Sequence, residues 1–152
     1  MNKRIAMLVA IIVVVSVIVA SCDSAPAPVT LSQLPTYSGA AKATNAAVTD
    51  MGNQMADGVS KLSISGASVK SVEHQEFSLP ADATADLVTG FFNTELAKNQ
   101  WTSDPQLAGS TGPVTYKGWM RGSQAVYAYH VTDASGTFGG NVLVVLLVTL
   151  AK

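Results

Sequence analysis

The stretch VTYKGWMRGSQAVYAYHV, residues 114–131, decides the fold because it predicts a β-hairpin with a defined register. Gly122-Ser123 places glycine first in a two-residue loop, as a type II′ turn requires. This turn sets Tyr116 opposite Tyr129, and residues directly opposite share a face of the sheet. One face then carries Val114, Tyr116, Gly118, Met120, Ala125, Tyr127, Tyr129 and Val131. Because both strands are apolar on this same face, the register that the turn selects is supported.

Further strands are predicted on both sides of this hairpin. The segment 142–150, VLVVLLVTL, is apolar on both faces, which is typical of a strand that is buried on both sides. We expect it to pair beside the strand that starts at Ala125, after a glycine-rich connection. The chain after Trp101 reads as a meander, and Val69–Leu79 reads as an earlier strand that ends at Pro80.

Two segments show helical periodicity. From Ala40 to Leu62, apolar residues recur every three or four positions, which predicts an amphipathic helix with a face of Ala and Met. A second helix is expected from Ala83 to Lys98, with Asp82 as its N-cap. Its apolar stripe contains Leu87, Val88, Phe91, Phe92 and Leu96. We therefore predict an α+β fold with an antiparallel sheet of about five strands and two helices, in the order helix, strand, helix and four-strand meander.

The N-terminus carries a motif of its own. Lys3 and Arg4 precede the apolar run Ile5–Ala20, which ends in Val19-Ala20-Ser21-Cys22. This order resembles the bacterial lipobox, which implies cleavage before a cysteine that carries diacylglycerol. The alternative is an uncleaved membrane span. About 16 residues extend only about 24 Å as a helix, short of the hydrocarbon core of about 30 Å, so the sequence favours a signal peptide.

The motif divides the chain into three parts. Residues 1–21 are expected to be a lipoprotein signal peptide, residues 22–35 a lipidated N-terminus and flexible tether, and residues 36–152 a single domain. The tether assignment rests on its richness in Ala, Pro and Ser. Localisation is then extracytoplasmic, with the membrane as partner through lipidated Cys22. As the single cysteine of the chain, Cys22 cannot form an internal disulfide.

Charge and composition exclude some functions. Cleavage removes Lys3 and Arg4 from the nine basic residues and leaves all of the ten acidic ones, so no basic footprint for nucleic acid remains. His74, in the run Glu73-His74-Gln75-Glu76, and His130 are distant in sequence and do not form a metal-binding signature. No cofactor, metal ligand or catalytic residue is expected. An envelope hydrolase or metal-binding protein that uses His74, His130 and nearby carboxylates remains the alternative.

Two longer patterns bear on the family. Leu34-Pro35-Thr36-Tyr37-Ser38-Gly39-Ala40 and the segment 91–101, FFNTELAKNQW, are similar to motifs of small bacterial lipoproteins of unknown function. In that family the motifs are P-x-Y-P-G-A and F-Y-x-x-x-L-x-x-x-G-W. Here Ser38 replaces proline, Phe92 replaces tyrosine, and Gln100 replaces the glycine before Trp101. The resemblance implies a helix followed by a β-meander, with the tryptophan in the core, and it implies no catalytic residue.

The hairpin also suggests where binding could occur. If the helix around Phe91 covers the tyrosine face, the opposite face exposes a candidate binding surface of Trp119, Arg121, Val126 and His130. A contiguous apolar patch with a polar rim is typical of a binding site, here for an envelope protein or an apolar ligand. The competing interpretation is that the Ala40–Leu62 helix buries this face. The predicted function is a non-catalytic binding or assembly domain at the cell envelope.

Overall fold

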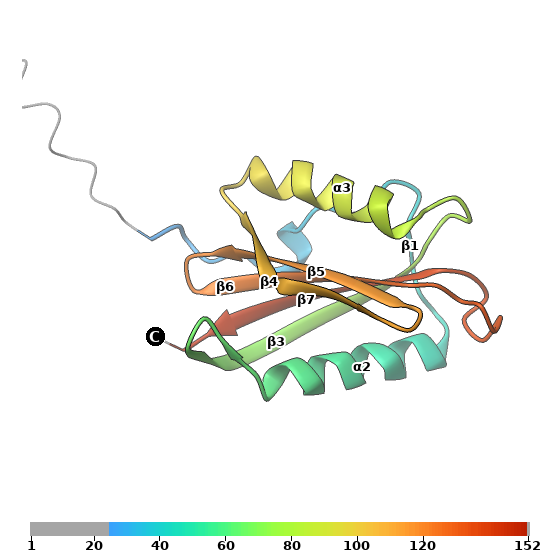
Figure 1. Ribbon diagram of the computed structural model, residues 1–152, viewed down its shortest axis with the longest axis horizontal. Coiled ribbons are helices and arrows are strands. Elements are labelled where there is room, and N and C mark those ends of the chain that lie inside the picture. Colours follow the sequence, from blue (N-terminus) through green and yellow to red (C-terminus); the bar gives the residue numbers. More distant parts are fainter. Residues whose placement is uncertain (1–24, 152) are drawn as a thin grey trace, which may run out of the picture.

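The computed structural model describes residues 25–151 (Figure 1). The signal peptide and Cys22 lie outside these residues. The elements in chain order are η1 (Leu31–Gln33), β1 (Ala41–Lys42), α2 (Ala46–Ser60), β2 (Ser63–Ile64), β3 (Ala67–Ser78), α3 (Ala85–Ala97), β4 (Thr102–Thr111), β5 (Val114–Arg121), β6 (Gln124–Val131) and β7 (Val142–Leu150). The α+β class is confirmed. None of the helices in the described range is long and apolar enough to cross a bilayer.

A single antiparallel sheet forms the centre of the fold. Its strand order is β1-β3-β7-β6-β5-β4, and β2 pairs with the first two residues of β3, Ala67 and Ser68. The four-strand meander β4 to β7 is confirmed. The sheet contains seven strands rather than about five, because β1 and β2 have two residues each. Two residues are too short to show an alternating pattern in a sequence.

The hairpin register is confirmed over its whole length. Tyr116 lies opposite Tyr129, Met120 lies opposite Ala125, and Arg121 lies opposite Gln124. Gly122 has a φ of 56°, in the left-handed region that glycine adopts at low cost. The turn chemistry therefore determined the pairing of both strands correctly.

The strand β7 lies between β3 and β6 and is buried on both faces, as its sequence predicts. Figure 1 shows α3 on one side of the sheet and α2 on the other. The core therefore has two halves, one on each face. Leu143, Val145 and Leu147 of β7 pack in the half under α3, and Val144, Leu146 and Val148 pack in the half under α2.

The helices cover the opposite faces from those expected. The helix α3 packs on the face of Trp119, whose ring lies 5.8 Å from that of Phe92. The indole Nε1 of Trp119 donates a hydrogen bond to Asn93 Oδ1 at 3.0 Å. The helix α2 packs on the tyrosine face instead, through Val48 and Val59. Strand alternation separates two faces but does not state which helix covers each, so the prediction for α3 was wrong.

Both helices begin later than the sequence suggested. The α2 helix starts after Asn45, whose side-chain oxygen accepts a hydrogen bond from the amide of Ala47 at 2.9 Å. Ala41–Lys42 instead pairs with the end of β3. The α3 helix is capped by Thr84 rather than Asp82, because residues 80–83 form a turn closed by the hydrogen bond from Ala83 N to Pro80 O.

The way in which α3 ends explains why Gln100 and Trp101 follow it in the motif of residues 91–101. The amides of Gln100 and Trp101 donate to the carbonyls of Ala97 and Leu96, at 3.2 Å each. Such an ending needs a left-handed residue, for which glycine is preferred, and Gln100 adopts it with a φ of 64°. Trp101 is only 5% exposed and lies in the core. The position where the resembled motif has glycine is therefore the one that adopts a positive φ.

The segment predicted as a flexible tether is part of the folded domain from Ala27 onward. Val29, Leu31 and Leu34 pack against the core under α3. Both groups of the Gln124 side-chain amide bond to the backbone of Val29, at 2.8 and 2.9 Å. The predicted domain boundary at residue 36 is therefore wrong. Richness in Ala and Pro does not reveal that three apolar side chains in such a segment have a surface to pack on.

Two glycines of α2 give a test of how tightly this helix packs. A Cβ placed on Gly52 would lie 1.9 Å from Glu76 Oε1, whereas a Cβ on Gly58 would meet nothing within 4 Å. Alanine in a helix interior is favoured over glycine by about 1 kcal/mol. We expect Gly58→Ala to raise the free energy of unfolding by about that amount. Overpacking typically costs about 1–3 kcal/mol, so Gly52→Ala should lower it.

Denaturant unfolding of the two variants measures this difference. The two substitutions are chemically identical and lie in the same helix, so each is the control for the other. Equal stabilisation by both would show that the Glu76 side chain does not pack under α2.

Candidate functional site

A groove lies on the tyrosine face of the sheet, with a volume of about 220 Å³. It is lined by the chain that leaves α2, by β2, and by residues of β4, β5 and β6. The lining residues are Leu62, Ser63, Ile64, Gln106, Leu107, Tyr116, Tyr127 and Tyr129. We refer to these eight residues as the tyrosine groove.

The position of α2 and an irregularity in β4 create this groove. The helix packs over β3 and β7, so β5 and β6 extend beyond it. The pairing of β4 with β5 shifts between Asp104 and Gly109, as in a β-bulge. The shift places Leu107 over Gly118, where an added Cβ would lie 2.5 Å from that of Leu107. Leu107 thereby forms one wall of the groove.

The three tyrosines form a row along the groove. Tyr127 and Tyr129 lie two residues apart on β6, with ring centroids 5.9 Å apart. Tyr116 of β5 lies opposite Tyr129, with centroids 5.2 Å apart. Both pairs are stacked with an interplanar angle of 26°. Such rings offer a large apolar surface with a polar hydroxyl at one end, and Leu62, which is half exposed, lies at the rim.

The groove is electrically neutral at its tyrosines. Burial raises the pKa of Tyr127 to about 12, and the nearby Tyr116 and Asp104 add to the shift. The pKa of Tyr129 is also raised, mainly by burial and then by its two tyrosine neighbours. No hydrogen bond joins any of the three hydroxyls to another residue of the range 25–151. The hydroxyls are therefore available to donate to or accept from a bound molecule.

The predicted binding surface is not open. Trp119, Val126 and His130 are each at most 5% exposed, and they lie under α3. His130 Nε2 lies 2.9 Å from the carbonyl oxygen of Ala83, just before α3. Arg121 is half-buried at the end of β5. The prediction of an exposed patch here was wrong, because α3 covers this face. The competing interpretation also expected a buried face, but it named α2 as the helix that covers it.

The histidines of the alternative function lie on opposite faces. His74 pairs in register with Leu146, which belongs to the core half under α2, while His130 pairs with Leu143, which belongs to the half under α3. The Nδ1 atom of His74 is hydrogen-bonded to Glu76 Oε1. Within residues 25–151, no three or more His, Cys, Asp and Glu side chains lie close enough to hold a metal ion.

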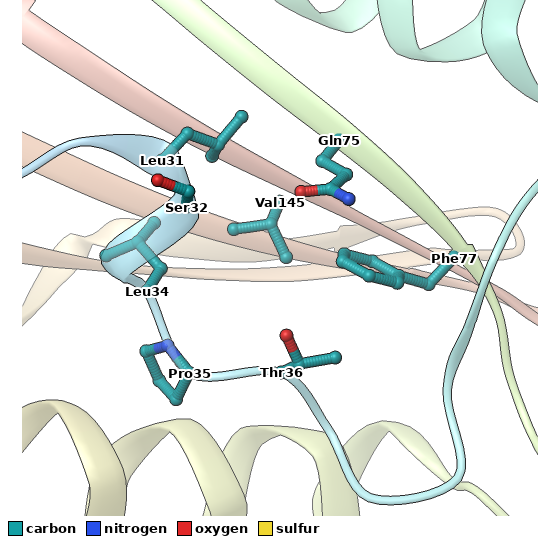
Figure 2. A pocket seen from close by; sticks show the side chains of 8 residues that line it. All are labelled: Leu31, Ser32, Leu34, Pro35, Thr36, Gln75, Phe77 and Val145. Atoms are coloured by element: carbon teal, nitrogen blue, oxygen red, sulfur yellow. The ribbon is translucent and has the colours of Figure 1, made fainter.

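Two other hollows lie beside the N-terminal segment. The first, of about 40 Å³, is shown in Figure 2 between the η1 segment and the side chains of Gln75, Phe77 and Val145. It has room for no more than a few water molecules. The second, of about 180 Å³, lies where the N-terminal segment meets the end of α3. Its lining is Val29, Gln33, Leu34, Pro35, Leu96, Asn99, Trp101 and Arg121, and we refer to it as the Arg121 hollow.

The sequence showed part of the tyrosine groove. It placed Tyr116, Tyr127 and Tyr129 on one face, which is confirmed, but assigned that face to the core. Leu62 and Leu107 were missed because their role depends on where α2 ends and on the shift in β4. Neither feature has a signal in the hydrophobic pattern.

Comparisons with protein-family models, with curated proteins and with solved structures found no match. The resemblance to small bacterial lipoproteins therefore stays a prediction, and the site is interpreted from its geometry alone.

The buried tyrosines predict an alkaline weakness of the fold. Tyr127 has a pKa of about 12 in the folded chain and about 10 when unfolded. Its stabilising effect is therefore complete below pH 10 and is lost as the pH rises through 12. We expect the free energy of unfolding to fall over this window, and Tyr127→Phe, which cannot ionise, to make the fall less steep. Denaturant unfolding at several pH values measures both slopes, and equal slopes would contradict the assigned burial.

Proposed function

We propose that this chain is a lipoprotein of the bacterial cell envelope, anchored by a lipidated Cys22, and that its domain binds a ligand in the tyrosine groove without catalysing a reaction. The anchor half of the proposal is supported by the order of basic, apolar and small residues before Cys22. A single acyl chain binds a membrane only marginally, whereas two chains hold firmly. A diacylglycerol on Cys22 would supply two.

The binding half rests on one observation, the row of three stacked tyrosines. Ligand sites are usually concave and lined by apolar and aromatic side chains with a few polar groups. The groove combines aliphatic walls from Leu107 and Ile64 with three hydroxyls and the Gln106 amide. No residue that lines it carries a charge. This lining suits an uncharged molecule that has an apolar face and a hydrogen-bonding group, or a side chain of a partner protein with the same chemistry.

The enzymatic or metal-binding alternative has less support. It needs His74 and His130 to act together, and the sheet separates them. His130 is also engaged with the carbonyl of Ala83 beneath α3. A binding domain needs no such convergence, so it is the better account of the described residues.

An uncharged fluorescent probe tests the groove. We expect 1-aminonaphthalene to bind the domain with increased emission, and Tyr129→Ala to weaken binding by up to about tenfold. That loss corresponds to about 0.5–1.5 kcal/mol for an aromatic contact. Tyr37→Ala is the matched control, because Tyr37 packs edge-on against Phe91 on the other side of the sheet. Circular dichroism checks that both variants fold.

Equal affinity of wild type and Tyr129→Ala would contradict the groove as the binding site. The same loss in both variants would do so as well, since it would reflect a general effect of removing a tyrosine.

A further inference from the structure

The N-terminal segment leaves the domain at one defined end. Arg121 Nη1 donates a hydrogen bond to the carbonyl of Ala27 at 2.8 Å, and Gln124 holds Val29 through two hydrogen bonds. Pro26 lies against Gly122 of the β5–β6 turn, since a Cβ built there would be 3.5 Å from the proline ring. The chain that precedes Ala27 therefore joins the domain beside the β5–β6 turn.

The covalent chain limits how far Cys22 can lie from that turn. Cys22 precedes Ala27 by five residues, and an extended chain spans at most about 3.6 Å per residue. Cys22 is thus within about 18 Å of Ala27. The eight residues of β6 extend about 27 Å at 3.4 Å per residue. The reach is shorter than the strand, so the two ends of the domain are not equivalent toward a membrane that holds Cys22.

We define the anchor end as the β5–β6 turn with the neighbouring ends of α2, α3 and β7. Figure 1 shows the described start of the N-terminal segment and the end of β7 at this end, and the hydrogen bond from Leu150 N to Ser123 O joins β7 to the turn. The far end comprises the β6–β7 loop, the β4–β5 turn and the starts of both helices.

Charge differs between the two ends. The anchor end carries the cations Lys61, Lys70, Lys98 and Arg121 and the anions Asp57, Glu95 and Asp104, the last of which is the third residue of β4. Two of these cations are paired with two of the anions, Lys61 with Asp57 and Lys98 with Glu95, both at 2.6 Å. The far end carries Asp50, Asp82, Asp86 and Asp133 with one cation, Lys42. Cations therefore slightly outnumber anions at the anchor end, whereas anions clearly outnumber cations at the far end.

The Arg121 hollow opens beside the turn and adds a specific anion-binding group. The guanidinium of Arg121 lies 5.9 Å from the centre of the Trp101 ring. Its Nε is buried and has no hydrogen-bond partner in the described chain, and no carboxylate of residues 25–151 forms an ion pair with it. The terminal Nη groups of a guanidinium can donate to phosphate oxygens, which a phospholipid headgroup presents.

We propose that the anchor end lies against the bilayer, with Arg121, Lys70 and Lys98 toward anionic phospholipid headgroups, and that the acidic far end points away. This orientation rests on the proposed lipidation of Cys22. Two features of the described chain support it: the short reach from the lipid to the β5–β6 turn, and the match between the cations of the anchor end and an anionic surface.

Site-specific labels on the full lipoprotein test the orientation. Cys22 is the single cysteine and its sulfur is blocked by the lipid, so a new cysteine is a unique labelling site. Ser123→Cys places a fluorophore at the anchor end. The matched control Ala134→Cys places it on the exposed far end. In vesicles with phosphatidylglycerol and a headgroup spin-labelled lipid, we expect quenching at position 123 to be several-fold stronger than at position 134.

A charge variant tests the electrostatic part. Lys70 and Lys98 are exposed, and neither forms a hydrogen bond with the described N-terminal residues 25–35. The double variant Lys70→Gln and Lys98→Gln should lower the quenching at position 123 on phosphatidylglycerol vesicles and leave it unchanged on phosphatidylcholine vesicles. Unchanged quenching at position 123 on phosphatidylglycerol vesicles would overturn the electrostatic part of the proposal.

Incorporation of radioactive palmitate separates the two proposals. Labelling that is lost in Cys22→Ser supports the lipid anchor, and absence of label in the wild type would overturn the proposed function itself. A lipidated protein with equal quenching at positions 123 and 134 would overturn the orientation while leaving the anchor in place.

Discussion

The burial of β7 on both faces is the constraint on which the rest of the structure depends. Eight of its nine residues are buried, and burial of apolar area stabilises a fold by about 25 cal/mol per Å². A strand of this kind needs neighbours in the sheet and a cover on each side. The fold supplies β3 and β6 as neighbours, α2 on one face and α3 on the other.

Neither helix covers its face of the sheet completely, and what lies over the uncovered part differs between the two faces. On the face of α3, the helix lies over β4, β5 and β6, and the segment with Val29, Leu31 and Leu34 completes the cover. On the other face, α2 lies over β3 and β7, and the row of tyrosines beside it borders an open groove. The docked N-terminal segment and the tyrosine groove thus arise from the same mismatch between helix and sheet. Gln124 makes the docking specific, since a buried amide left unpaired would cost about 1–3 kcal/mol.

The sequence predicted those features that depend on local chemistry. The register of the hairpin followed from Gly122-Ser123 and the shared apolar face, and the burial of β7 followed from its apolar pattern. The burial of Trp101 was an implication of the resembled motif. Features that depend on distant packing were missed: the face covered by each helix, the caps Asn45 and Thr84, and the docking of Val29. The candidate surface around Trp119 was misplaced for the same reason, because a face and its cover come from separate parts of the chain. The three tyrosines were placed correctly on one face, but their exposure depends on where α2 stops.

The central claim is that the chain from Ala27 to Leu34 packs as part of the fold rather than serving as a flexible tether. Native-state amide hydrogen exchange of the full chain tests this most directly, because the amide of Val29 donates to Gln124 Oε1. The account predicts that this amide is protected in the wild type, and that Gln124→Ala removes the protection while the amide of Tyr127, within β6, stays protected. Exchange of the Val29 amide in the wild type at the rate of an unstructured peptide would contradict the account.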